Sequence, residues 1–368
     1  MADATDGAIG LALPQRLDAD ARFRGRGLAI GIVDAGFHPH PDLVRPTNRI
    51  RVWADATSEP TESRWYDLDD VPVWPEMPAA ERAAEWHGLM TSVTAGGNGW
   101  LSDGRFRSLA SESDIALVRV GRGGAIGADA IARALRWLRT HADVLRLRVV
   151  SLSVAGDDVP LDADNEIDDE VEALVADGVV VVAAAGNDGI RRLLPPATSV
   201  DAITVGGLDD HQSKQRERWE QWHSNYGVVR GNAAKPELIA PSVWTVAPVL
   251  PGSELARESR QLFVQHRLRT SEIDRRIADL RLVTPHYHLV QGTSIAAPIV
   301  ASLAACMIEA NPELTPERIK ELLMLSASRL RDVPPERQGA GAVNAGRAVA
   351  AALANASTHL NNSGAAVA

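Results

Sequence analysis

Residues 28–36 read Leu-Ala-Ile-Gly-Ile-Val-Asp-Ala-Gly, an apolar run that ends in one carboxylate followed by two small residues. A short run that is apolar at nearly every position is typical of a strand buried on both faces of a sheet. Similar runs lie at residues 115–120, 149–153, 179–184 and 203–206. Helical patterns accompany them at residues 88–95, 128–141, 168–177 and 294–310. This alternation predicts an α/β fold: a doubly wound, mostly parallel central sheet with helices on both faces, in three layers.

The predicted sheet and helices occupy residues 27–350, which we expect to form one domain after an N-terminal segment of residues 1–26. Residues 51–86 are polar and rich in tryptophan, and they predict a surface excursion held by its aromatic side chains. Residues 251–285 place leucines and isoleucines among many charges, which predicts a helical insertion in the domain. Residues 351–368 include small polar residues that cannot support a core, so a disordered C-terminal tail is expected.

The composition argues against some partners. The chain of 368 residues has a formal net charge of −10, whereas nucleic acids and anionic membrane surfaces attract clustered Lys and Arg. No secretory signal is visible, and no apolar stretch is expected to reach the ~18 residues that span a bilayer, so a cytoplasmic location is expected. The single cysteine, Cys306, lies in an apolar run and is interpreted as a buried, inert thiol.

Some polar residues at the ends of predicted elements suit hydrolysis by a serine. This chemistry requires a nucleophile, a base, a carboxylate that orients the base, and a donor for the developing oxyanion. The candidates are Ser294 and His87, each at the start of a predicted helix, Asp34 at the end of a strand, and Asn187 after a buried run. Each also has a structural interpretation, as a helix cap or a turn residue. Their occurrence together, in the order Asp, His, Asn, Ser, favours catalysis.

The sequence resembles the subtilase (subtilisin-like, S8) family over roughly residues 27–350. The resemblance is carried by Gly31-Ile-Val-Asp-Ala-Gly36, His40-Pro-Asp-Leu43, His87-Gly88, Ala184-Ala-Gly-Asn187, Gly292-Thr-Ser-Ile-Ala-Ala-Pro298 and two further stretches, residues 149–156 and 339–345. The order Asp, His, Ser is that of subtilisin. The resemblance implies that Asp34 orients His87 and that His87 accepts the proton of Ser294. It also implies that Asn187 assists the Ser294 backbone N–H in the oxyanion hole.

The resemblance further implies two walls of an S1 pocket, at residues 153–156 and 183–186. It implies that residues 121–127 pair with the substrate as an edge strand, which recognises the peptide backbone more than its side chains. The substrate-binding residues implied in this way are Gly121, Gly124, Ser153, Val154, Ala155, Gly156, Ala184 and Gly186. Ala155 stands where the family often has glycine, so a pocket that disfavours the bulkiest side chains is expected.

Some positions depart from the family pattern. Leu89 and Met90 replace the Thr-His pair that commonly follows the catalytic His-Gly, which alters the packing beside the base. Asp42 matches a position that ligates a structural calcium in many subtilases, but the loop that supplies the other ligands is not recognisable at residues 96–104. Calcium prefers six to eight oxygen ligands, so calcium at Asp42 is a hypothesis, and no cofactor is required for the chemistry.

Residues 157–170 contain eight acids and no base. One interpretation is a solvated loop that leads into a helix, whose N-terminus favours carboxylates. The other is that these residues, with Asp188, attract substrates that carry basic residues near the scissile bond.

The sequence therefore predicts a serine endopeptidase that forms an acyl-enzyme on Ser294 with a peptide or protein substrate. Two alternatives stay open: a peptide ligase or cyclase, in which an amine intercepts the same acyl-enzyme, and a catalytically silent peptide-binding scaffold. Few residues precede Asp34, so the chain resembles an intracellular or propeptide-free subtilase whose activity is restrained in another way. Residues 251–285 could form a lid, a contact with a second copy of the chain, or a partner-binding arm.

Overall fold

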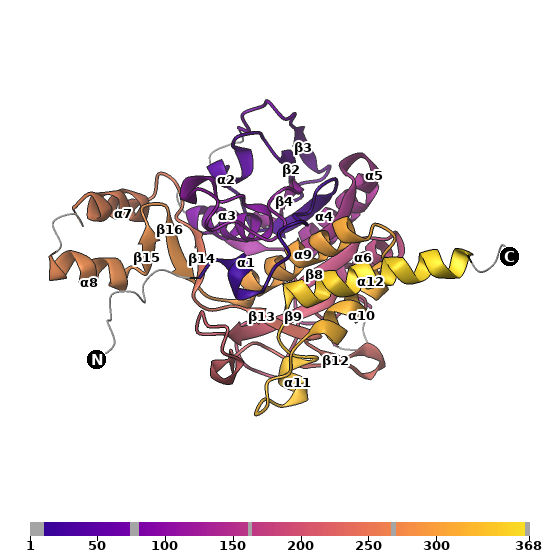
Figure 1. Ribbon diagram of the computed structural model, residues 1–368. Helices are drawn as coiled ribbons and strands as arrows, with labels where there is room; N and C mark the ends of the chain where they lie inside the picture. Colours follow the sequence, from indigo (N-terminus) through magenta and orange to yellow (C-terminus); the bar gives the residue numbers. More distant parts are fainter. Residues whose placement is uncertain (1–10, 74–80, 161–163, 266–269, 365–368) are drawn as a thin grey trace.

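The computed structural model describes residues 11–73, 81–160, 164–265 and 270–364, and a mostly parallel sheet lies at its centre (Figure 1). The strand order is β10-β9-β8-β7-β1-β4-β2-β3, with β13 paired to β9. The strands are β1 Ala29–Asp34, β2 Ile50–Asp55, β3 Glu62–Trp65, β4 Asp114–Arg119, β7 Leu147–Leu152, β8 Val180–Ala184, β9 Ile203–Asp209, β10 Glu220–Gln221 and β13 Leu238–Pro241. Only the pairs made by β3 and β10 are antiparallel in this sheet. The predicted fold class is confirmed.

Strand β1 lies where the strand order reverses. It pairs with β4 along one edge and with β7 along the other, so the chain leaves β1 in one direction and later returns on the opposite side. In open α/β sheets, ligands bind in the crevice outside the carboxyl ends of the strands at such a point. Asp34, the last residue of β1, occupies this position.

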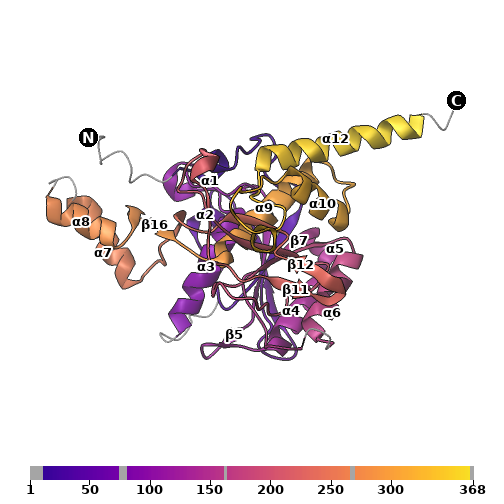
Figure 2. The same cartoon turned by 90° about the horizontal axis from the view of Figure 1, so that it is seen from below.

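Helices cover both faces of the sheet (Figures 1 and 2). They are α1 Leu13–Arg16, α2 Pro41–Val44, α3 Arg82–Gly96, α4 Ala128–Thr140, α5 Ala142–Leu145, α6 Glu166–Ala176, α7 Glu254–Gln265, α8 Ser271–Asp279, α9 Thr293–Ala310, α10 Pro316–Ser326, α11 Pro335–Gln338 and α12 Ala345–Gly364. Ile30 and Ile32 belong to the hydrophobic cluster on the side of α3 and α9, and Val33 to the cluster on the side of α4 and α6. Every residue of β1 is buried, as its unbroken apolar run predicts.

The five apolar runs predicted as strands correspond to β1, β4, β7, β8 and β9, with small shifts at their ends. The prediction of a surface excursion over residues 51–86 is wrong for its first part, because residues 50–55 form β2 inside the sheet. Trp53 is 5% exposed there. Arg51 gives this strand its polar character and pairs with Asp114 at 2.8 Å. Trp74 lies outside the described residues.

Helix α3 begins at Arg82, earlier than the predicted residue 88, so His87 lies inside the helix and not at its start. Gly88 follows it, where an added Cβ would lie 1.7 Å from the carbonyl oxygen of Gly36. Only glycine therefore allows α3 to pack this closely against the loop that follows β1.

Helix α9 runs through the core. By length and composition it could cross a membrane, so the expectation that no apolar stretch reaches that length is wrong. However, 83% of it is buried inside the fold, where it packs against α3, α12, β7, β8 and β9. The burial accounts for its apolar character. Cys306 of this helix is buried, as predicted, and burial raises the pKa of its thiol.

The insertion predicted at residues 251–285 contains α7 and α8, which stand on a small antiparallel sheet. That sheet consists of β14 Thr245–Pro248, β15 Leu282–Thr284 and β16 Tyr287–Val290. A separate hydrophobic cluster, which includes Leu262 and Ile273, joins the two helices. Figure 1 shows this arm projecting from the side of the body.

The C-terminal residues differ from the disordered tail predicted from residue 351. Helix α12 continues to Gly364 and extends away from the body in both views (Figures 1 and 2). Its first turns are rich in alanine, the best helix former, and Ala348, Val349 and Ala352 are buried where α12 packs on α9 and α10. Because helix formation propagates easily from a packed start, the helix extends into the polar residues that follow.

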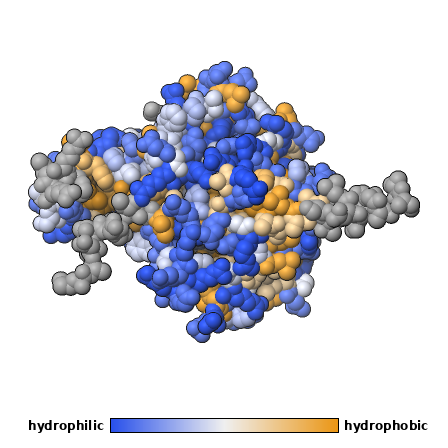
Figure 3. All heavy atoms as spheres, in the orientation of Figure 1, coloured by the Kyte–Doolittle hydropathy of each residue, from blue (hydrophilic) through white to orange (hydrophobic). Residues whose placement is uncertain are grey.

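Two short hairpins lie outside the central sheet. They are β5 Gly121–Arg122 with β6 Ala125–Ile126, and β11 Gly227–Val229 with β12 Ala233–Lys235. The face of the molecule in Figure 3 is mainly hydrophilic, with hydrophobic residues gathered where α10 and α12 lie together. Leu325 of α10 is 73% exposed.

Candidate active site

Asp34 and His87 meet at the carboxyl end of β1. His87 Nδ1 lies 2.7 Å from Asp34 Oδ1, and the Asp34 side chain is 0% exposed whereas that of His87 is 30% exposed. The negative charge of Asp34 raises the pKa of His87, in opposition to the lowering effect of burial. Because Nδ1 faces the carboxylate, Nε2 is the ring nitrogen that a substrate or nucleophile could use.

Ser294 is the second residue of α9, where the positive end of the helix dipole favours negative charge. Gly292 before it has φ +138°, a conformation that favours glycine. Pro298 lacks an N–H and cannot donate to the Ser294 carbonyl in the helical pattern. The Ser153 hydroxyl supplies that bond instead, with Oγ 3.0 Å from the Ser294 oxygen. Ser153, predicted only as a pocket wall, therefore also supports the start of α9.

Helices α3 and α9 pack against each other and carry His87 and Ser294. Among the hydrogen bonds of the described residues, none joins the Ser294 hydroxyl to the His87 ring. Catalytic hydrogen bonds are often long without substrate and shorten in the complex. The arrangement is thus compatible with transfer of a proton between these residues.

The orientation of the Asn187 side chain is set by Thr293. Asn187 Oδ1 accepts hydrogen bonds from the Thr293 backbone N at 2.9 Å and from the Thr293 hydroxyl at 2.8 Å. The same hydroxyl accepts a bond from Gly186 N at 3.1 Å. With its oxygen held in this way, the exposed Asn187 presents the N–H groups of its amide as donors beside Ser294.

The predicted walls of the S1 pocket leave the sheet at adjacent strand ends. Residues 153–156 follow β7, and Ala184 ends β8, which pairs with β7. Gly156 N donates to the Pro195 oxygen at 2.8 Å, and an added Cβ at Gly156 would lie 2.5 Å from Ile167 Cδ1. Val154 is buried whereas Ala155 is exposed. Gly186 has φ +100°, which lets the chain turn sharply before Asn187.

The predicted edge strand begins at Gly121 and forms the β5–β6 hairpin. Gly121 is buried, and an added Cβ would lie 2.5 Å from the Ala35 oxygen, directly after Asp34. Gly124 is exposed in the turn of the hairpin with φ +81°. The hairpin thus starts against the site, and its tip points away from the core.

An ion pair connects this hairpin to the helix that carries His87. Glu81, the N-cap residue of α3, accepts a hydrogen bond from Gly123 N at 3.1 Å and one from Arg119 at 2.8 Å. Arg119 in turn donates to the Gly121 oxygen at 2.8 Å. The Glu81–Arg119 pair therefore holds two backbone groups of the hairpin.

Three residues of the acidic run form ion pairs within the chain. Asp158 pairs with Arg192 at 3.0 Å, and Arg136 binds both Glu166 at 2.5 Å and Glu170 at 2.8 Å. These contacts support the helix-start interpretation for Glu166 and Glu170, whereas the attraction of basic substrates stays a prediction.

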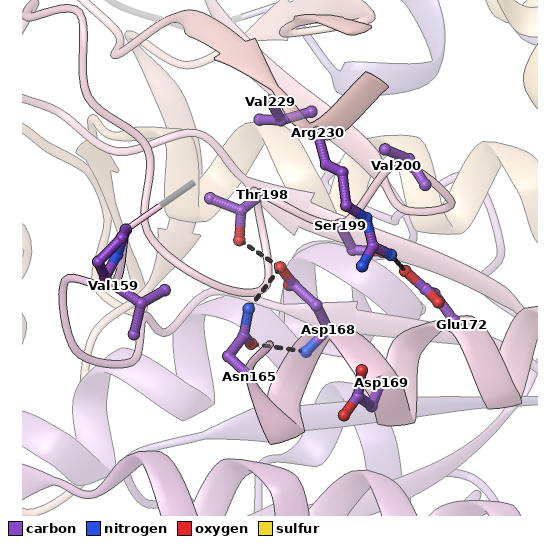
Figure 4. Close-up of a pocket in the computed structure, with 11 residues that line it drawn as sticks. Val159, Asn165, Asp168, Asp169, Glu172, Thr198, Ser199, Val200, Val229 and Arg230 are labelled. Carbon is purple, nitrogen blue, oxygen red and sulfur yellow. Dashed lines mark hydrogen bonds and ion pairs between the residues drawn. The ribbon is translucent and has the colours of Figure 1, made fainter. Parts of the chain in front are cut away.

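A pocket at the start of α6 is lined in part by acids of this run, and one of them, Asp168, is hydrogen-bonded within the chain (Figure 4). Asn165 caps α6 by accepting from the Asp168 N at 2.8 Å, and the Asp168 carboxylate accepts from Asn165 and Thr198, each at 2.8 Å. Burial raises the pKa of Asp168. This carboxylate is thus engaged by groups of the chain at the start of α6.

The surroundings of Asp42 do not fit calcium. Its carboxylate is 0% exposed and accepts hydrogen bonds from the Tyr287 hydroxyl at 2.7 Å and from Leu101 N at 3.2 Å. The buried Arg49 guanidinium donates to the backbone oxygens of Asp42, Gly96 and Ser113 at 2.6, 2.6 and 3.0 Å. Calcium needs free oxygen ligands, whereas these already bind protein donors and one of those donors is a cation. Within the described residues, no cluster of three His, Cys, Asp or Glu side chains could hold a metal ion.

The sequence reasoning missed several supporting residues. Thr293 lies inside the Gly292-Thr-Ser motif, so its contact with Asn187 could have been suspected from that adjacency. No sequence motif marks Arg49, Glu81 or Thr91. The residues with which they form these hydrogen bonds lie far away in the sequence.

Comparisons with known proteins agree with this geometry. The profile of the subtilase family matches residues 25–341. The serine protease AprX of Bacillus subtilis is 30% identical over 339 residues, which cover 88% of this chain and 66% of AprX. The chain thus spans slightly less than two thirds of the length of that relative. Subtilisin Savinase of Lederbergia lenta is 24% identical over 87% of this chain and 90% of its own length.

Solved structures show the same fold. The CspB protease of Clostridium perfringens superposes with a TM-score of 0.71 at 16% identity, covering 95% of this chain and 99% of the other. A protease of Pseudoalteromonas arctica has a TM-score of 0.64 at 21% identity, with 95% and 96% coverage.

Proposed function

This chain belongs to the subtilase family, and from that membership we propose that it is a serine endopeptidase whose nucleophile is Ser294. The observation that carries the proposal is the hydrogen bond between Asp34 and His87 at the reversal point of the sheet. The start of α9 and the oriented Asn187 amide lie at the neighbouring strand ends. Nucleophile, base, orienting carboxylate and oxyanion donor are thus supplied by separate elements that one fold brings together.

The reaction begins when the Ser294 Oγ attacks the carbonyl carbon of the scissile peptide bond. His87 Nε2 takes the hydroxyl proton, and the resulting imidazolium is stabilised by the Asp34 carboxylate. The carbonyl oxygen becomes an oxyanion that accepts hydrogen bonds from the Asn187 amide and the Ser294 backbone N–H. His87 then gives its proton to the leaving amine as the C–N bond breaks, which leaves an ester on Ser294.

A water molecule completes the cycle. His87 removes a proton from it as its oxygen attacks the ester, and the same oxyanion donors stabilise the second tetrahedral intermediate. Collapse of that intermediate returns the proton to Ser294 and releases the carboxylic acid. No metal ion takes part in any of these steps.

The substrate is an extended peptide segment of a protein. We infer that its backbone lies between the β5–β6 hairpin and residues 153–156, both of which begin beside the Asp34–His87 pair. Pairing of main-chain groups gives affinity without requiring one side-chain sequence. Ala155, which is exposed, would present an apolar side chain to the substrate beside this wall.

The test is labelling with a fluorophosphonate, a reagent that phosphonylates activated serines. Mass spectrometry of the labelled wild-type protein should place the adduct on Ser294. Ser294→Ala and His87→Ala should abolish labelling, whereas Ser326→Ala, a buried serine remote from the site, should retain it. Absence of labelling in the folded wild type would contradict the proposal. Digestion of an unfolded protein with an added amine nucleophile then separates hydrolysis from ligation, and free carboxylic acid products are expected.

A further inference from the structure

Besides the His87 ring and the backbone N–H of Ala35, the Asp34 carboxylate has a third hydrogen-bond donor. Oδ1 faces His87 Nδ1 and also accepts from Ala35 N, both at 2.7 Å. Oδ2 accepts from the Thr91 hydroxyl at 2.8 Å. Because Asp34 is 0% exposed, bulk water cannot solvate Oδ2. An ionised oxygen buried without a partner is costly, so the Thr91 bond has energetic weight.

Thr91 is placed for this contact by helix geometry. It follows His87 by four residues on α3, which puts both side chains on the same face of the helix, one turn apart. Its side chain is fully buried. The hydroxyl has one proton and two acceptors within reach, Asp34 Oδ2 at 2.8 Å and the Gly88 oxygen at 3.2 Å. The nearer, charged acceptor is the stronger one.

We propose that Thr91 is a positioning residue of the reaction, acting on His87 through Asp34. Two neighbouring side chains of one helix, His87 and Thr91, bind the two oxygens of a single carboxylate. These two hydrogen bonds fix the rotation of the Asp34 carboxylate. The carboxylate in turn fixes the ring plane and the tautomer of the His87 imidazole. Thr91 contacts neither substrate nor the reacting atoms. The inference rests on the proposed function, because it presumes that His87 is the general base.

Removal of the Thr91 hydroxyl should shift the pH dependence of the reaction in a predictable direction. Without Thr91 as donor, the anionic carboxylate loses stabilisation, so the Asp34–His87 pair binds its proton more tightly. The acid limb of kcat/KM should then move to higher pH. Loss of orientation should lower kcat, whereas KM should stay nearly constant because no substrate contact is removed.

The experiment compares wild type with Thr91→Val, which keeps the shape, and Thr91→Ser, which keeps the hydroxyl. Thr91→Val should lower kcat about 10- to 100-fold, keep KM within about twofold and raise the midpoint of the acid limb. Thr91→Ser should restore both values to within about threefold of wild type. Ser92→Ala is the matched control, because the buried Ser92 hydroxyl donates to the Leu89 oxygen and does not contact Asp34. It should leave the acid limb unchanged.

Equal effects of Thr91→Val and Thr91→Ser, or an unchanged acid limb in Thr91→Val, would show that Thr91 merely fills space. If Thr91→Val fails to fold, Thr91→Ala provides the same contrast with serine. If the wild type is neither labelled nor active, the proposed function fails first. The positioning role is then tested separately by NMR titration of the His87 ring, which should still differ between Thr91→Ala and Thr91→Ser.

Discussion

The side-chain oxygen of Asn187 accepts two hydrogen bonds from Thr293, the residue directly before Ser294. The candidate oxyanion donor is therefore fastened to the candidate nucleophile across a gap of more than one hundred residues in sequence. An Asn187 amide flipped by 180° would present its oxygen to the oxyanion and repel it. The two hydrogen bonds from Thr293 prevent this flip, so the amide N–H groups can donate to the oxyanion.

Asn187→Ala should lower kcat by about 10²- to 10³-fold with little change in KM, because the lost bond is made mainly in the transition state. That magnitude is known from removal of one oxyanion donor in subtilisin itself. Thr293→Val, which removes the hydroxyl and leaves the backbone N, should cost about tenfold. Steady-state kinetics on a peptide substrate measure both. A loss confined to KM in Asn187→Ala would show that the amide binds ground-state substrate instead.

The pH dependence follows from the Asp34–His87 pair. The base must be neutral, and the charge of Asp34 raises the pKa of His87 above its ordinary value of 6.5. Activity should therefore fall on acidification with a midpoint above 6.5 in the free protein. Asp34→Asn removes the charge, so its residual activity should show a lower midpoint, with kcat reduced about 10⁴-fold. The kcat/KM profile on a substrate without ionisable groups measures this, and a midpoint below 6.5 in wild type would be inconsistent with the geometry.

Calcium should not bind at Asp42. Arg49 already binds the backbone oxygens of Asp42, Gly96 and Ser113, so a chelator has no ion to extract at this site. Thermal unfolding with EDTA and with added calcium should give the same Tm. A Tm that rises with calcium would show that the ion binds in spite of the guanidinium.

Arg49→Met should destabilise the fold by about 3 kcal/mol, because it removes the buried hydrogen bonds to the backbone oxygens of Asp42, Gly96 and Ser113. Arg51→Met is the control, since the Arg51–Asp114 pair keeps some contact with water, with side chains 19% and 18% exposed, and should contribute less than the buried Arg49. Denaturant unfolding of both variants gives the comparison. Equal destabilisation would refute a special role for Arg49.

The Glu81–Arg119 pair should matter for long substrates only. Glu81→Gln weakens the hold on Arg119 and Gly123 N, which loosens the β5–β6 hairpin. We expect KM to rise about tenfold for peptides that extend four residues before the scissile bond, the cost of about one backbone hydrogen bond. Labelling by the small fluorophosphonate should be unaffected.

Asp55→Asn tests the specificity of that effect, because Asp55 contacts Arg119 at 3.2 Å but does not contact the hairpin. It should change KM less than Glu81→Gln does. A rise in KM that is independent of peptide length would assign Glu81 to the pocket or to folding.

The site could be predicted from the sequence to the extent that its chemistry is local. Ser294, Asn187 and Asp34 lie in short motifs whose glycines and small residues are required by the backbone, as the positive φ of Gly186 and Gly292 shows. The buried strands were recognisable because a strand covered on both faces must be apolar throughout. The strand at residues 50–55 was not recognised in this way, because Arg51, which pairs with Asp114, makes a strand inside the sheet look polar.

The sequence by itself determined the fold class and the candidate residues for the chemistry, because these depend on apolar periodicity and on residue type. Tertiary structure alone decided how those residues are held. Thr91 contacts Asp34, Thr293 contacts Asn187, and Arg49 binds the Asp42 loop where calcium was a hypothesis. Each is a hydrogen bond made by a buried residue, Thr91, Thr293 or Arg49, whose donor must find whichever acceptor the packing places nearby. That choice depends on distances between elements, which no local pattern encodes.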